Sequence, residues 1–154
     1  MCKHALALAV ALLAGTCQGQ SILGDAERSS LEDGARFRIL GASTAPPREI
    51  LGFCADHNGN LAAPGARWNS IDVMISGLPS RRLIWVARSD GFYVTHYEQG
   101  GFSHSNHVTV ARIKSNPEGY ELIWRAEGPR LRDYADFTRS LKSNAFHPEP
   151  LANR

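Results

Sequence analysis

The sequence predicts an α+β domain: an antiparallel β-meander of four or five strands packed by a C-terminal α-helix, with a short N-terminal helical segment. The clearest observation is the dipeptide Asp90-Gly91, a hairpin turn between two segments rich in β-branched and aromatic residues, 81–88 and 92–98. A second is the helical spacing of apolar residues that follows the strands. Strands and helices do not alternate along the chain, which excludes the parallel sheet of an α/β fold.

Four further segments have the composition of strands. Residues 106–113 and 120–126 flank the turn 116–119, which contains Asn, Pro and Gly. Residues 69–75 form a candidate strand before the first hairpin, and residues 36–40 alternate charged and bulky side chains, as in a short strand. Because the later strands follow one another through short turns, we expect a meander.

Two segments predict helices. Residues 46–53 open with two prolines, which are tolerated in a first helical turn, and residues 55–67 then form a loop rich in turn residues. Within residues 130–142, apolar side chains recur three or four positions apart, at Leu131, Tyr134, Phe137 and Leu141. We expect this amphipathic helix to cover one face of the sheet.

Turn geometry predicts which residues face one another across the strands. The first hairpin turns at Asp90-Gly91. The loop between the second and third strands is assumed to be symmetric about its midpoint, and the third turn lies at 116–119. The predicted pairs are Trp85 with His96, Ala87 with Val94, Val94 with Thr109, His96 with His107, Thr109 with Trp124, Ala111 with Leu122, and Arg112 with Glu121. A slip of one residue would exchange the two faces.

This register divides the apolar side chains between two faces. The face expected under the C-terminal helix carries Leu83, Trp85, Ala87, Phe92, Val94, Leu122 and Trp124. The opposite face carries Ile84, Val86, Val108, Val110 and Ile123. Because the opposite face is too apolar for free solvent, we expect the N-terminal segment or a partner to cover part of it.

The first 19 residues have the layout of a secretory signal peptide. Lys3 precedes ten apolar residues, 5–14, and cleavage is expected after Gly19, so that the mature chain begins near Gln20. The alternatives are a cut beside residue 14 or 16, a lipoprotein carrying acyl chains on Cys17, or a buried helix of the domain. No apolar run reaches the roughly 18 residues of a membrane span.

The remaining chain is expected to comprise three parts. Residues 20–35 form a flexible leader or one short helix, residues 36–145 a single α+β domain, and residues 146–154 a C-terminal tail. A length of 154 residues favours one domain. The expected location of the exported chain is periplasmic or extracellular.

Removal of residues 1–19 leaves Cys54 as the single cysteine. In an exported protein, such a residue is a buried inert thiol, half of an intermolecular disulfide, or a nucleophile. His57 follows three positions later and supplies the imidazole that a cysteine nucleophile needs. This spacing is common by chance, so the sequence favours a buried thiol.

Charge gives no indication of a polyanionic partner. The sequence has 17 basic and 15 acidic residues, a formal net charge of +2. The arginines at 81–82 and at 130 and 132 are interleaved with acidic residues, which is typical of a balanced, solvated surface. Nucleic-acid binding is therefore not expected.

A group of histidines is the main candidate for chemistry. His96, His104 and His107 lie within twelve residues, with Glu98 beside them. If His96 and His107 face each other, both imidazoles can reach one metal ion, with His104 or Glu98 as a third ligand. No established ligand spacing is matched, so we expect satisfied histidines and no bound metal or other cofactor.

These observations favour a small exported protein-binding, inhibitor or accessory module without catalytic residues. Its partner would be another protein or a second copy of the chain. The expected binding surface comprises His96, Glu98, His104 and His107 together with the aromatic residues Tyr97 and Phe102; Tyr93 lies nearby. The alternative is a small histidine-based or metal-dependent hydrolase that uses His96, His104, His107 and Glu98.

Overall fold

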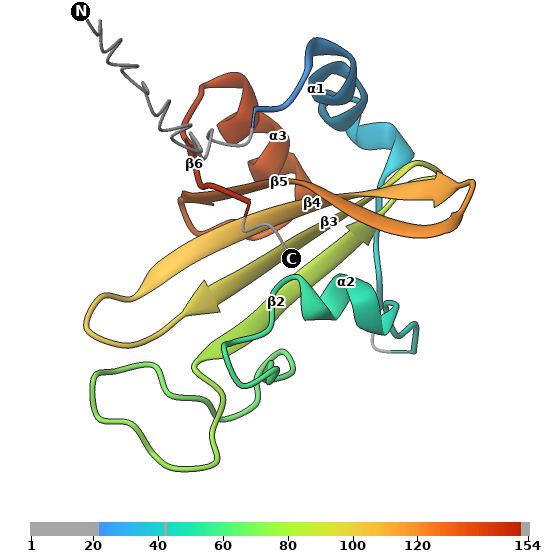
Figure 1. Cartoon of the computed structure of the whole chain (residues 1–154). Helices are drawn as coiled ribbons and strands as arrows, with labels where there is room; N and C mark the ends of the chain where they lie inside the picture. The colour runs from blue at the N-terminus through green and yellow to red at the C-terminus, as the bar shows by residue number, and fades with distance from the viewer. Residues whose placement is uncertain (1–21, 42, 152–154) are drawn as a thin grey trace, which may run out of the picture.

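The computed structural model describes residues 22–41 and 43–151. Its centre is a six-stranded antiparallel sheet in sequential order, with α1 and α3 on one face and α2 on the other (Figure 1). The elements are α1 (Asp25–Glu32), the 3-10 turn η1 (Gly34–Arg36), β1 (Arg38–Ile39), α2 (Arg48–Gly52), β2 (Arg81–Arg88), β3 (Phe92–Gln99), β4 (Ser105–Ser115), β5 (Glu118–Gly128), α3 (Tyr134–Lys142) and β6 (His147–Pro148). The α+β class and the antiparallel meander are confirmed.

The sheet has six strands, where four or five were expected. β6 pairs with Ala126 and Glu127 at the edge beside β5, within the segment expected to be a tail. Phe146, next to β6, packs into the main core. A two-residue strand carries no alternation, so its sequence gives no strand signal.

The N-terminal part of the described chain belongs to the folded domain. Of the two alternatives for residues 20–35, the structure has a short helix, α1, and Leu31 on it is fully buried in the main core. The hydroxyl of Tyr134 on α3 donates a hydrogen bond to the Leu31 carbonyl at 2.9 Å. Residues 1–19 and the expected cleavage site beside Gln20 lie outside the described residues.

The first hairpin has the predicted register at its tip, where Trp85 pairs with His96 and Ala87 with Val94. A β-bulge at Ile84 then shifts the pairing, so that Leu83 lies opposite Tyr97. The extra residue moves Leu83 to the face opposite α3, where it packs against α2. The expected placement of Leu83 was therefore wrong.

The register between β3 and β4 differs from the prediction by one residue. Tyr97 pairs with His107, and His96 pairs with Val108. The loop runs over residues 100–104, so its centre of symmetry falls on Phe102 instead of between two residues. The expected pair of His96 with His107 was wrong, and these two side chains lie on opposite faces of the sheet.

A second bulge lies between β4 and β5. Val110 pairs with Trp124, where Thr109 was expected, while Ala111 pairs with Leu122 as predicted. The bulge returns Trp124 to the α3 face but leaves Leu122 opposite Ala111, which belongs to the other face. As a result of the two bulges and the shifted β3–β4 register, four apolar residues expected on the far face pack with the main core: Ile84, Val108, Val110 and Ile123.

The main core lies between the sheet and the helices α1 and α3. Trp85 and Trp124 are both buried there, as predicted, against Phe137 and Leu141 of α3. The helix begins at Tyr134, later than expected, because the preceding four residues form a loop that is bound to the sheet by polar contacts. On the other face α2 contributes Ile50 to a smaller cluster that contains Val86, Tyr93 and Ala111.

Residues 69–75 form a loop, so the expected strand was wrong. The cause is the buried side chain of Asn69: its amide nitrogen donates to the carbonyls of Ile75 (3.1 Å) and Leu78 (2.8 Å), and its oxygen accepts from the Ile75 N–H at 2.8 Å. These bonds replace the ladder that a strand would have formed. Among the residues described, no helix has the length and apolar character needed to cross a membrane.

Candidate functional site

His96 is fully buried on the α3 face of the sheet, and both nitrogens of its ring are engaged. The backbone N–H of Leu131 donates to Nε2 at 3.1 Å, so Nε2 carries no proton. Nδ1 therefore carries the proton and donates to the His107 carbonyl at 3.0 Å. Burial lowers the pKa of His96 from 6.5 to about 4, which keeps the ring neutral.

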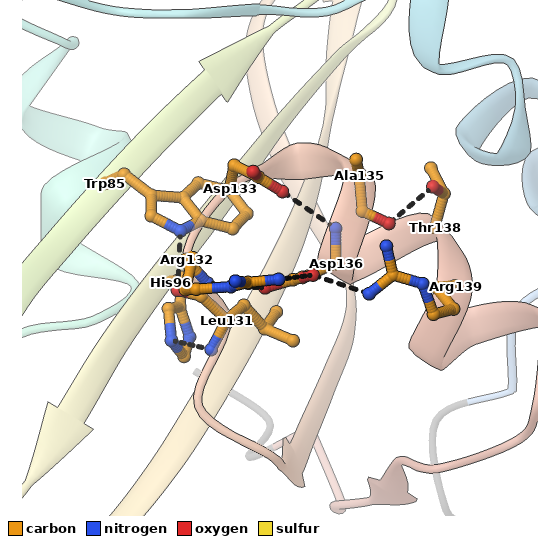
Figure 2. A network of polar contacts seen from close by, with 9 residues as sticks. All are labelled: Trp85, His96, Leu131, Arg132, Asp133, Ala135, Asp136, Thr138 and Arg139. Atoms are coloured by element: carbon orange, nitrogen blue, oxygen red, sulfur yellow. Dashed lines mark hydrogen bonds and ion pairs between the residues drawn. The ribbon is translucent and has the colours of Figure 1, made fainter.

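Trp85 completes the attachment of the loop before α3. Its indole N–H donates to the Leu131 carbonyl at 3.2 Å, while His96 accepts from the N–H of the same residue (Figure 2). Downstream, Asp133 accepts from the Asp136 N–H at 2.9 Å and caps α3. His96 is thus a structural residue with no nitrogen left for a metal ion or a substrate.

His107 lies on the opposite face, in a different environment. Its ring stacks on Tyr97 with centroids 5.2 Å apart. Its Nε2 lies 2.7 Å from the Ser105 hydroxyl, and its Nδ1 lies 2.9 Å from Oε1 of Glu149. The bond to His107 holds the pKa of Glu149 below its usual value. This histidine joins the chain after β6 to the sheet.

Glu98 and His104 form a third environment, at the end of β3. The Glu98 carboxylate is buried, and it accepts from Nε of Arg82 at 2.6 Å and lies 2.8 Å from Nε2 of His104. The guanidinium of Arg82 lies 5.0 Å from the centre of the Trp68 ring, which also packs against His104. This arrangement holds the β3–β4 loop against the loop that contains Trp68.

The predicted histidine site is therefore divided among three places. His96 faces the main core, His107 faces away from it, and His104 pairs with Glu98 at the loop end of β3. Within the described part of the chain, no group of three or more His, Cys, Asp or Glu side chains could hold a metal ion. The geometry gives no support to the hydrolase alternative.

Cys54 is fully buried, and its thiol lies 3.2 Å from the hydroxyl of Thr109. Burial raises the pKa of this thiol to about 11, so the nucleophilic thiolate is scarce at neutral pH. His57 is exposed in the loop that follows. The structure thus has the buried thiol that the sequence favoured.

The arginines near residues 81 and 130 are engaged with neighbouring polar groups. Arg81 donates to the side chain of Gln99 and to the Ala55 carbonyl. Arg132 donates to the carboxylate of Asp136, and this bond is the main cause of the lowered pKa of Asp136. These contacts match the charge-balanced surface expected from the sequence.

The feature that the sequence did not reveal is a cluster of exposed apolar side chains at one end of the sheet, here called the apolar tip. Its members and their exposed fractions are Ile71 (59%), Val73 (66%), Met74 (55%), Ile75 (51%) and Phe102 (99%). Phe102 was a predicted binding residue and lies at the surface. Tyr97 and Tyr93, expected beside it, are buried.

Two loops build the apolar tip. The first follows Asn69, and the second joins β3 to β4 beside it (Figure 1). The loops pack closely at Gly100: a Cβ at this position would lie 2.0 Å from the Asn69 carbonyl oxygen, and only glycine avoids that overlap. The Gly100 N–H also donates to the Ser80 carbonyl at 3.0 Å. The tip is therefore held in place by buried polar groups.

Comparisons with known proteins found no matching family model, no matching curated protein and no matching solved structure. The functional argument accordingly rests on the geometry of this chain.

Proposed function

We propose that this protein is an exported protein-binding module and that the apolar tip is its docking surface. The observation that carries the proposal is the presence of five large apolar side chains that are exposed in two adjacent loops, although apolar side chains are normally buried. Apolar patches of this kind are typical of interaction sites. The export follows from the signal-peptide pattern of residues 1–19.

The hydrogen bonds that order the first loop of the apolar tip favour binding. Asn69 uses its side-chain amide to fix the loop through three hydrogen bonds to the backbone of Ile75 and Leu78. A loop that is already ordered loses less conformational entropy when it docks, which strengthens association. Burial of the exposed side chains of Met74 and Phe102 would then supply the hydrophobic contribution.

The chemistry of the tip favours a protein partner over a lipid surface. Asp72 is exposed between Ile71 and Val73, and a carboxylate at this place is costly to insert into a bilayer. An apolar groove with a polar rim can accept the apolar side chains and leave Asp72 in water. We therefore infer a partner with such a groove on its surface.

Site-directed photo-crosslinking in cells that produce and export the protein tests this proposal. A photoreactive residue at position 74 or 102 should crosslink to one other protein, and the same residue at the exposed position Glu118, at the opposite end of the sheet, should not. Crosslinking from position 74 should be lost when Val73 and Ile75 are changed to Ser. Crosslinks only to lipid, only to a second copy, or equally from position 118 would overturn the proposal.

A further inference from the structure

The outer edge of β2 is only partly covered by other segments of the chain. At one end β1 pairs with Ala87 and Arg88, and the Leu40 N–H donates to the Val86 carbonyl. At the other end Ala62 bonds to Arg81 and Leu83 as an isolated parallel bridge. Between these two contacts lie only Ile84 and Trp85, at the bulge of the first hairpin.

A half-open cavity of about 480 Å³ occupies this gap. Ile39 of β1, the segment between β1 and α2, Leu51 of α2, residues 61–64 and β2 form its walls. The main aliphatic wall residues are Leu40, Pro46, Leu51, Leu61, Leu83 and Ile84. This volume lies within the range of about 300–1,000 Å³ that is typical of small-molecule sites.

The side chains that line the cavity are mostly aliphatic. Thr44 contributes a hydroxyl at the exposed rim. Among residues 22–41 and 43–151, no charged side chain lines the cavity itself, so its interior suits a hydrocarbon chain better than a charged metabolite. The uncovered stretch of β2 spans two residues, which is too short to pair with an added peptide strand.

A cation lines a second hollow that shares two wall residues with the cavity. Leu51 and Leu61 line both the cavity and an adjoining surface hollow, and Arg48 of α2 lines that hollow. Arg48 is exposed and forms no ion pair within residues 22–41 and 43–151. Its guanidinium is therefore available to donate hydrogen bonds to the carboxylate of a ligand.

We propose that this cavity binds a free fatty acid, with the hydrocarbon chain against the aliphatic walls and the carboxylate at Arg48. An apolar cavity with a cation in the adjoining hollow provides contacts for both ends of such a molecule. This site lies on the β2 edge and does not use the side chains of the apolar tip, so the inference is independent of the proposed docking surface.

Calorimetric titration of the purified full chain with dodecanoate, below its micelle concentration, tests the proposal. We expect one molecule to bind per chain, and Ala45→Trp, which fills the cavity from its exposed rim, to weaken binding at least tenfold. Arg48→Gln should weaken dodecanoate binding about two- to fivefold and leave binding of dodecanol unchanged, since an exposed ion pair is lost. Arg130→Gln, an exposed arginine before α3, is the matched control and should bind like the wild type.

Each remaining outcome contradicts the proposal. Absence of dodecanoate binding would exclude the site, provided that thermal unfolding shows the chain to be folded. Equal binding by wild type and Ala45→Trp would place the fatty acid elsewhere, and Ala63→Trp, at another exposed wall position, should give the same loss if the first variant is impaired in folding. Equal affinities for dodecanoate and dodecanol would show that Arg48 does not bind the carboxylate. Binding only to phospholipid vesicles would indicate a membrane surface and not a free fatty acid.

Discussion

Trp85 and His96 are direct cross-strand partners, and together they bind both backbone polar groups of Leu131. The indole donates to the carbonyl and the imidazole accepts from the N–H. This pair explains why α3 starts three residues after Leu131 and why a buried histidine is retained in the core.

The free energy of unfolding should decrease when the pH falls from about 6.5 to about 4. The folded-state pKa of His96 is about 4, and its value in the unfolded chain is about 6.5. The unfolded chain therefore takes up a proton first as the pH falls, and the neutral ring stabilises the fold fully only above about pH 6.5. The expected loss reaches about 3 kcal/mol at pH 4.

Urea unfolding of wild type and His96→Gln at several pH values measures this effect. The variant should be less stable at pH 7 and should lack most of the decrease between pH 6.5 and 4. His57→Gln, at an exposed histidine in a loop, serves as the control. Equal pH dependence in wild type and His96→Gln would show that His96 does not remain neutral.

Trp124→Ala should reduce the free energy of unfolding by roughly 3–5 kcal/mol. The side chain is buried in the main core and packs edge-on against Phe146, so its removal leaves a cavity. Phe102→Ala, at a fully exposed aromatic residue, should change stability by less than about 0.5 kcal/mol. A change below about 1 kcal/mol for Trp124→Ala would contradict the assigned packing.

Asn69→Ala should cost roughly 1–3 kcal/mol, because it removes the three hydrogen bonds that this buried side chain makes to the backbone of Ile75 and Leu78. Hydrogen exchange at the Ile75 amide should accelerate in this variant, since that N–H donates to the Asn69 side chain. Ser70→Ala, at the adjacent exposed position, is the control and should leave both measurements unchanged.

The Cys54 thiol should react with a disulfide reagent only after unfolding. It is fully buried and its pKa is about 11, so neither access nor thiolate is available at neutral pH. Labelling followed across a urea series should therefore track the unfolding transition. Rapid labelling in the absence of urea would contradict the buried placement.

The sequence predicted the elements of this fold better than their register. The Asp90-Gly91 turn set the first hairpin correctly because a two-residue turn fixes its own pairing. The bulges at Ile84 and between Val110 and Ala111 have no local sequence signal, and each moved neighbouring side chains to the other face.

The candidate site was less predictable, for a related reason. A register error of one residue paired two histidines that lie on opposite faces. Residues 71–75 have strand composition, but the Asn69 side chain is bonded across the loop to the backbone of Ile75. Side-chain bonds to distant backbone groups are not visible in local patterns.

Oxidation of Met74 measures the central claim most directly. This methionine is 55% exposed in the apolar tip, and the only other one is Met1. Dilute peroxide should oxidise Met74 rapidly in the purified chain and at least about tenfold more slowly in the intact native envelope, where a bound partner covers the tip. Equal rates in the two samples would show that the apolar tip is not a docking surface.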